Sequence, residues 1–232
     1  MARVSGPSAR YEDRREDIID RAAALFAEQG YAAVGVSELG DAVGLGRGAL
    51  YYYIGSKESL LVAIQDRVLR PLLARATGIV AVEARPVVQL RLLSEALLSL
   101  ILTRVDHIRV YEHDYVHLTG ANRKRVLDQR RQFEEIVRGL LEQAIADGSL
   151  RDMDPRLAAL QFLNLHNHTY QWARTANRHW SVPELSREYC QTLFHGMARN
   201  GRRVMVTDAE WQRAQRLLAA QGTVSEVAGR RR

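Results

Sequence analysis

The chain contains a single cysteine, Cys190, and only five prolines among its 232 residues. One thiol cannot form a disulfide within the chain, and a lone cysteine in a helical pattern is usually a small core residue. No run approaches the roughly 20 uncharged apolar residues of a membrane-spanning helix, and the N-terminus lacks an apolar signal core. We therefore expect a cytoplasmic protein without a membrane partner, and Cys190 is given no catalytic role.

Glycine is also limited, to 16 residues, while Ala, Leu, Arg and Glu dominate the composition. This balance favours helix over sheet. No internal repeat or β-alternating segment stands out, and a hydrophobic content of 47% is enough to build a sizeable core. The predicted fold class is all-α, with nine or ten helices.

The positive charge of the chain is unevenly distributed. The formal net charge is +6 and the pI is about 9.8, which is compatible with a polyanionic partner. Residues 1–67, however, hold eight Lys/Arg against ten Asp/Glu, a local balance of 8 − 10 = −2. Bulk charge therefore does not single out this segment for nucleic-acid binding, and such a function must be argued from its motif.

The N-terminal third has the pattern of a helix-turn-helix. Residues 1–12 are expected to form a flexible arm, and a support helix then runs from near Asp13 to Gly30. Two short helices, at 36–43 and 47–53, flank the turn Gly44-Leu-Gly46. Ala49, Leu50 and Tyr53 are able to face inward.

A fourth helix should start after Ser56 and end at Arg70-Pro71, since proline disfavours helix in the residue before it. The predicted domain covers residues 13–69, with the motif at about 35–54.

The rest of the chain predicts a second, larger helical domain at 70–201. Two helix starts are clearly marked in it: Asp154-Pro155 is an N-cap followed by proline, and Ser181 with Glu184 is a capping box. Residues 202–232 form an extension with one helix, capped by Thr207 and Glu210, and a basic tail. The expected helices of the second domain are 87–104, 107–118, 121–147, 155–178 and 183–199.

The segment Gly44–Glu58, GLGRGALYYYIGSKE, resembles the signature of the TetR/AcrR family, and the resemblance runs through residues 14–67. It implies an N-terminal helix-turn-helix DNA-binding domain followed by a larger effector-binding and dimerisation domain. The chain departs from the usual pattern at Gly46, Ala49, Tyr53 and Ile54, where Ser, Thr, His and Phe are common. Two hydroxyls that often touch DNA are therefore missing, and we expect altered phosphate contacts and base preference.

The predicted DNA contacts lie around the third helix, whose N-terminal residues would reach base edges in a major groove. Arg47 can donate two hydrogen bonds to guanine or clamp a phosphate, Gly48 permits close approach, and Ala49 can meet a thymine methyl. Three successive tyrosines point about 100° apart and cannot share one role. The predicted DNA-binding residues are Val36, Ser37, Arg47, Gly48, Ala49, Tyr51, Tyr52, Tyr53 and Lys57.

The C-terminal region is similar to the subgroup that includes repressors of fatty-acid and steroid catabolism. The similarity rests on Arg130–Glu134, Gly148–Arg151, Asp154-Pro155, Asn167 and Trp172. It implies an acyl-CoA thioester as effector, and polar or aromatic side chains on buried helices would orient such a ligand. The alternative is a core or interface role. The candidates are Tyr111, His113, Asn167, His168, Tyr170 and Trp172.

A homodimer is expected, because two recognition helices one DNA turn apart can read a palindromic operator. The resemblance places the dimer interface on the last two helices of the second domain, with an apolar seam of Leu185, Tyr189, Leu193 and Met197. Double-stranded operator DNA, a small-molecule effector and a second copy are thus the expected partners.

The predicted function is a ligand-responsive repressor without enzymatic activity, cofactor or metal. Activation or corepression remains open, as does an architectural DNA-binding protein without an effector. The alternative from another class is a metal-dependent helical enzyme. His113 and His117 lie four residues apart, and His168 can approach from another helix. No nucleophile, paired-carboxylate or phosphate-loop motif accompanies these histidines.

Overall fold

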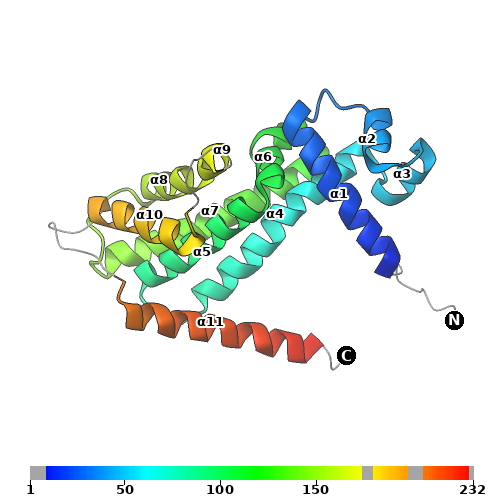
Figure 1. Cartoon of the computed structure of the whole chain (residues 1–232). Helices are drawn as coiled ribbons and strands as arrows, with labels where there is room; N and C mark the ends of the chain where they lie inside the picture. The colour runs from blue at the N-terminus through cyan, green and yellow to red at the C-terminus, as the bar shows by residue number, and fades with distance from the viewer. Residues whose placement is uncertain (1–8, 174–179, 198–205, 230–232) are drawn as a thin grey trace. The chain divides into compact units, whose positions relative to one another are not determined.

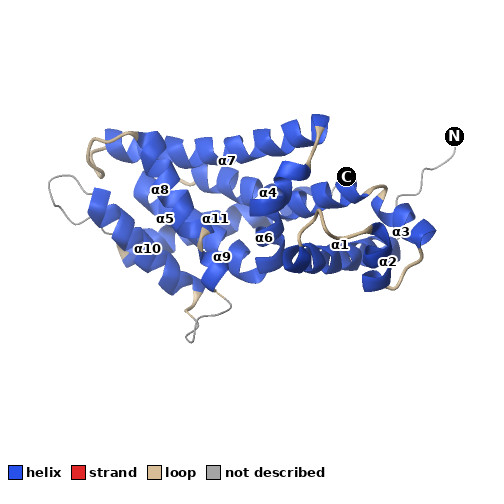
Figure 2. Ribbon diagram, turned by 90° about the horizontal axis from the view of Figure 1, so that it is seen from above, coloured by secondary structure: helices blue, strands red, loops and turns tan. Residues whose placement is uncertain are grey.

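The computed structural model describes residues 9–173, 180–197 and 206–229, and only helices and loops are drawn among them (Figure 2). The all-α prediction is confirmed, although the described residues form eleven α-helices and one 3₁₀-helix rather than nine or ten. The expected arm at 1–12, the end of the 155–178 helix and the tail at 230–232 lie wholly or partly outside the described residues.

The contacts divide the chain into two compact units. Unit 1 consists of Met1–Arg70 and Arg104–Asp128, and unit 2 of Pro71–Thr103 and Gln129–Arg232. Helices α4 (Lys57–Val80) and α7 (Gly120–Ala146) each contribute to both units. The functional division near residue 70 stays a prediction.

Unit 1 holds the helix-turn-helix. Its helices are α1 (Ala9–Gln29), α2 (Val36–Val43), α3 (Arg47–Ile54), the first part of α4, α6 (Val105–His113), the 3₁₀-helix η1 (Asp114–His117) and the start of α7. The apolar stripe of α1 buries Ile18, Ala22 and Phe26, as its spacing predicts. Helix α1 packs against both α2 and α6 (Figure 1), so it supports the motif, and α6 in turn contacts η1.

Unit 2 is built around α5 (Pro86–Thr103), which contacts all four other helices that belong to this unit alone. These are α8 (Pro155–Asn167), α9 (Thr169–Trp172), α10 (Val182–Met197) and α11 (Asp208–Gly229) (Figure 1). Helix α5 is long and apolar enough to cross a membrane by composition alone. Its buried residues pack against neighbouring helices, which is the behaviour of a core helix.

Several predicted boundaries are wrong. Helix α4 does not end at Arg70 but continues through Pro71 to Val80, because burial of Leu72, Ala76 and Ile79 offsets one lost backbone hydrogen bond. Helix α1 begins before Asp13. The expected helix at 107–118 is α6 followed by η1, and that at 155–178 is interrupted after Asn167. The predicted caps are confirmed at Ser56, Asp154, Ser181 and Thr207.

Candidate nucleic-acid interface and effector region

The turn between α2 and α3 depends on two glycines. Gly44 ends α2 in the left-handed conformation, at φ 67°, where a side chain would be strained. The Leu45 amide donates to the Gly40 carbonyl across 2.9 Å. A Cβ on Gly40 would lie 2.6 Å from the Leu45 carbonyl oxygen, so only glycine lets the turn pack this closely on α2.

Helix α3 presents a distinct outer face. Leu50 and Ile54 are buried, while Arg47, Gly48 and Ala49 are exposed and Tyr52 is 71% exposed. The prediction that Ala49 faces inward is therefore wrong, and Ile54 takes the inner position four residues after Leu50. Within the described residues Arg47 has no ion-pair partner, and its guanidinium lies 5.8 Å from the centre of the Tyr51 ring.

Tyr11 of α1 braces two of the tyrosines of α3. Its ring stacks on Tyr53 with centroids 5.0 Å apart, and meets Tyr52 edge-on at 5.5 Å. The Tyr11 hydroxyl also donates to the Tyr52 carbonyl oxygen across 3.5 Å. Tyr53 is half-buried by these contacts, so its expected partial core role is a packing role against α1.

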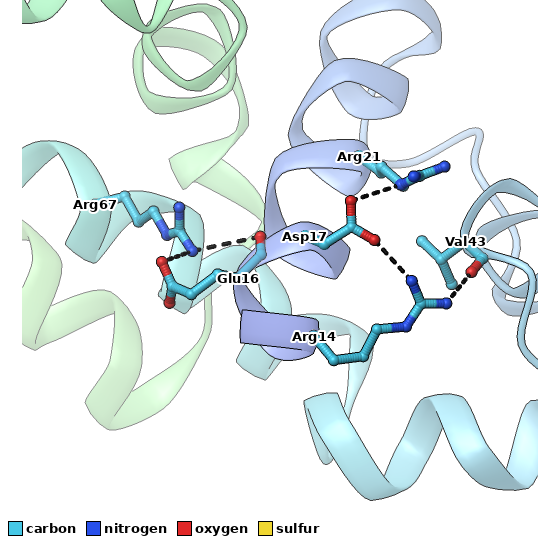
Figure 3. A network of polar contacts seen from close by, with 6 residues as sticks. All are labelled: Arg14, Glu16, Asp17, Arg21, Val43 and Arg67. Atoms are coloured by element: carbon cyan, nitrogen blue, oxygen red, sulfur yellow. Dashed lines mark hydrogen bonds and ion pairs between the residues drawn. The ribbon is translucent and has the colours of Figure 1, made fainter. Parts of the chain in front are cut away.

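Arg14 joins α1 to the end of α2. Its Nη2 donates to the Val43 carbonyl across 2.7 Å, and its Nη1 donates to Asp17, which also accepts from Arg21 (Figure 3). The last carbonyls of a helix have no partner within it, so Arg14 caps α2 beside the turn. The sequence reasoning missed this residue. The sequence signal that could have found it is its position four residues before Ile18. This spacing places the Arg14 side chain on the same helix face as the buried stripe of α1.

Much of the acidic charge of unit 1 is paired. Arg67 of α4 bonds Glu16 and Asp20 of α1 (Figure 3 shows the Glu16 pair). His107 lies 3.2 Å from Asp20, but burial, the dominant influence, lowers the pKa of its imidazole to about 4. His107 is therefore neutral near pH 7, and the Asp20 carboxylate is satisfied by Arg67. These pairs leave the balance of residues 1–67 at −2, since Arg67 is already counted, but they hold Glu16 and Asp20 against α4.

Lys57 lies at the first position of α4 and points toward the loop after α1. Its Nζ donates to the Tyr31 carbonyl across 2.5 Å and lies 4.2 Å from the centre of the Tyr31 ring. Burial lowers the pKa of the Lys57 ammonium. In this arrangement Lys57 positions Tyr31, and its predicted contact with a DNA phosphate stays a prediction.

Tyr31 and Glu58 also connect the helix-turn-helix to η1 and to the start of α7. The Tyr31 amide donates to Asp114 across 3.4 Å, and its ring stacks on His117 at 5.3 Å. Burial raises the pKa of the Asp114 carboxyl. Glu58, beside Lys57, accepts hydrogen bonds from the Thr119 amide and the Asn122 side chain. Contacts of both α4 and the α1–α2 loop therefore converge on residues 114–122.

The six predicted effector residues fall in different parts of the chain. Tyr111 and His113 lie on α6 in unit 1, and Tyr111 is buried. The other four lie in unit 2 around the junction of α8 and α9, where Tyr170 is buried and His168 is exposed. Among the residues that the structure describes, no group of three or more His, Cys, Asp or Glu is arranged to hold a metal ion. Effector contact by these six residues stays a prediction.

Among the described histidines of unit 2, His166 is fully buried, whereas the predicted His168 is exposed. The ring nitrogens of His166 lie 2.7 Å from the Phe162 carbonyl and 2.7 Å from the Ser94 hydroxyl. Because the carbonyl can only accept, Nδ1 donates to it and Nε2 accepts from Ser94. Burial lowers the pKa of His166 to about 4. The opposite orientation of His166 and His168 follows from their spacing, but the Ser94 partner is 72 residues away and has no local signal.

The predicted dimer seam on α10 is partly used within the chain. Leu185 and Met197 are buried, and the Tyr189 hydroxyl lies 2.9 Å from that of Thr169. Helix α8 instead exposes Leu157 and Leu160, at 56% and 46%. These two leucines were missed by the sequence reasoning, although their three-residue spacing puts them on one helix face.

Comparison with known proteins gives the family. The N-terminal helices match the profile of bacterial regulatory proteins of the tetR family over residues 18–64, and residues 83–197 match the tetracyclin repressor-like C-terminal domain. The transcriptional repressor KstR2 of Rhodococcus jostii is 30% identical over 195 residues, which cover 80% of this chain and 91% of that protein. This chain belongs to the TetR family.

Solved structures of TetR-family proteins have the same fold. The ketosteroid transcriptional regulator KstR2 of Mycobacterium tuberculosis superimposes with a TM-score of 0.75 at 25% identity. The match covers 85% of this chain and 100% of the KstR2 chain. The regulator AibR, solved with isovaleryl coenzyme A and operator DNA, gives 0.69 at 24% identity, over 78% of this chain and 98% of AibR. Together with the family match, this identifies the chain as a DNA-binding regulator of transcription with an N-terminal helix-turn-helix.

Proposed function

We propose that this chain is a dimeric repressor that binds a palindromic operator through α3 and leaves it when an acyl-CoA thioester binds. The observation that carries the proposal is the exposed surface of α3, where Arg47 has no ion-pair partner among the described residues and Tyr52, on the same helix, is also exposed. An arginine at the start of such a helix can donate two hydrogen bonds to guanine in the major groove. The regulator acts in the cytoplasm and has no catalytic role.

The effector class is supported by two relatives. AibR was solved with isovaleryl coenzyme A, and KstR2 is described as a ketosteroid regulator. Both descriptions fit a ligand with a carbon skeleton of low polarity. In a coenzyme A thioester this skeleton is joined to a carrier with several phosphate charges, which arginines can bind. The matched relatives are transcriptional regulators, so nothing in the comparisons favours the metal-dependent enzyme.

Operator release is the direct test. A labelled operator duplex is titrated with the protein, and the complex is then challenged with acyl-CoA thioesters of increasing chain length. Free coenzyme A and the free acids serve as controls. Release by one thioester class, with both controls inactive, is expected. An operator complex that every thioester leaves intact would contradict the proposed effector class while leaving DNA binding unaffected.

The dimer uses α8 and α10 as its interface in this proposal. Leu157 and Leu160 supply exposed apolar surface on α8, and half-buried Leu193 supplies it on α10. Leu160→Asp should shift sedimentation toward the monomer and weaken operator binding with it, because a monomer contacts only one half-site. Arg216→Asp, at an exposed position on α11, serves as the control. Unchanged sedimentation of Leu160→Asp would remove α8 from the interface.

A further inference from the structure

Helix α11 lies beyond the part of the chain that matches the family. The match to the C-terminal domain ends at residue 197, whereas α11 spans Asp208–Gly229. It packs against α5 within unit 2 (Figure 1). Any surface that α11 helps to form is therefore an addition of this chain to the matched domain.

The first turns of α11 are firmly attached to α5. Thr207 and Glu210 form a reciprocal capping box, and Glu210 accepts from the Arg85 guanidinium across 2.5 Å. The Arg85 hydrogen bond is the largest cause that lowers the pKa of Glu210 to about 2. Arg91 of α5 lies 4.3 Å from the centre of the Trp211 ring, and Ala214 is buried. These contacts fix the direction in which α11 continues.

The next turns of α11 form one wall of a groove instead of closing onto α5. The groove has a volume of about 680 Å³, within the range of small-molecule sites. All of its lining residues belong to unit 2: they come from the end of α4, from α5, from α11, and from Val182. The residues that matter for the chemistry are Leu72, Arg75, Glu95, Ser99, Gln215 and Leu218.

The charges around the groove favour an anion. Glu95 is half-buried, and burial raises the pKa of its carboxyl while Arg91 and Arg75 oppose that rise. Two guanidiniums thus act on one carboxyl, which leaves an excess of one positive charge. Arg91 already covers the Trp211 ring, whereas Arg75 is exposed and has no ion-pair partner among the described residues. Arg75 is the cation that is available to a ligand.

We propose that the groove between α4, α5 and α11 is a second ligand site, which binds an amphipathic monocarboxylate. Its carboxylate pairs with the Arg75 guanidinium, and its apolar body lies against Leu72 and Leu218. Ser99 and Gln215 offer hydrogen bonds to a hydroxyl along that body. The site uses none of the six residues predicted for the effector, and its occupancy does not depend on the acyl-CoA proposal.

The test is isothermal titration of the full chain with dodecanoate, kept below its micelle concentration. We expect one dodecanoate per chain. Arg75→Gln should weaken binding at least about tenfold, the usual size for loss of a charged hydrogen bond. Leu218→Asp should weaken it as much, because it places a like charge and a polar group on the α11 wall. 1-Dodecanol, which lacks the carboxylate, should bind weakly, and its affinity should be the same for the parent protein and for Arg75→Gln.

Matched controls lie on the same helix. Arg216→Gln removes an arginine that does not line the groove, and Leu217→Asp makes the same change one residue away from Leu218. Both should bind dodecanoate like the parent protein, and circular dichroism should show all four variants folded. Absence of binding to the parent protein would overturn the proposal. So would binding that Arg75→Gln and Leu218→Asp leave unchanged, since the fatty acid would then occupy another part of the chain.

Discussion

The guanidinium of Arg14 donates a hydrogen bond to the carbonyl oxygen of Val43, 2.7 Å away, and so joins the second turn of α1 to the last turn of α2. The contact lies directly before Gly44, where the chain turns toward α3. A charged donor on an otherwise unpaired helix carbonyl fixes the angle at which the turn leaves α2. Arg14 therefore holds the end of α2 and the turn that leads to α3, the helix that the proposal assigns to DNA reading.

Arg14→Gln should lower the free energy of unfolding by about 1–2 kcal/mol, allowing for the partial exposure of the pair, and weaken operator binding about tenfold. Arg21→Gln is the control, because Arg21 also bonds Asp17 and carries the same charge but does not reach α2. Urea unfolding and fluorescence anisotropy on operator DNA measure the two effects. Equal operator affinities of the two variants would remove Arg14 from the positioning role.

Gly40→Ala should destabilise the protein, although alanine is the better helix former. The new Cβ would meet the Leu45 backbone oxygen at 2.6 Å, and a backbone atom cannot move aside as a flexible side chain can. We expect a net loss of about 1–3 kcal/mol.

Gly139→Ala provides the matched comparison for this change. Gly139 lies inside α7 with nothing within 4 Å of its would-be Cβ, so alanine there should stabilise the protein by about 0.5–1 kcal/mol. Thermal unfolding monitored by circular dichroism compares the two. A stabilised Gly40→Ala protein would show that the turn does not pack closely on α2.

The stability of the protein should fall as the pH decreases below the ordinary pKa of histidine, 6.5. Burial lowers the folded-state pKa of His166 to about 4, so the unfolded chain takes up a proton at a pH where the folded chain does not. The stabilisation is complete above pH 6.5 and is lost as the pH falls toward 4. For His166 alone the loss between pH 7.5 and pH 5 is about 2 kcal/mol.

His166→Gln should show a shallower loss over the same pH range, while His168→Gln, two residues away and exposed, should behave like the parent protein. Urea unfolding at pH 7.5 and pH 5 measures the difference. His107, whose pKa burial also lowers to about 4, leaves part of the slope in both variants. An identical slope in His166→Gln and His168→Gln would show that His166 does not titrate as its burial requires.

The role of Lys57 can be separated by the salt dependence of binding. Loss of a phosphate contact reduces the slope of log affinity against log salt by about 0.9. Because the Lys57 ammonium is held by the Tyr31 carbonyl and ring, Lys57→Gln should weaken operator binding with an unchanged slope. Anisotropy titrations at four salt concentrations provide the slopes. A slope reduced by about one unit would instead establish the phosphate contact predicted from the resemblance.

Local patterns in the sequence were sufficient for the helix-turn-helix and its caps. Gly44, the stripe of Ile18, Ala22 and Phe26, and the capping pair of Thr207 with Glu210 each signal structure within a few residues. Pro71 misled the boundary of α4, because its local penalty is smaller than the burial of the residues after it.

Contacts between distant segments were not accessible in this way. His166 with Ser94, and Arg14 with Val43, are paired by tertiary packing, and a single sequence contains no periodic signal for either pair. The groove beside Arg75 depends on where α11 docks, which the caps of α11 do not reveal. Sequence therefore predicted elements and their chemistry better than the sites formed between elements.

The central claim is that α3 reads an operator, and it is tested most directly by binding the full chain to DNA from upstream of its own gene. Arg47→Ala and Tyr52→Ala are compared with Arg216→Ala, an exposed arginine on α11. We predict sequence-specific binding that both α3 variants weaken at least about tenfold and that the control retains. Specific binding that is equally strong in Arg47→Ala and Tyr52→Ala would contradict α3 as the recognition helix.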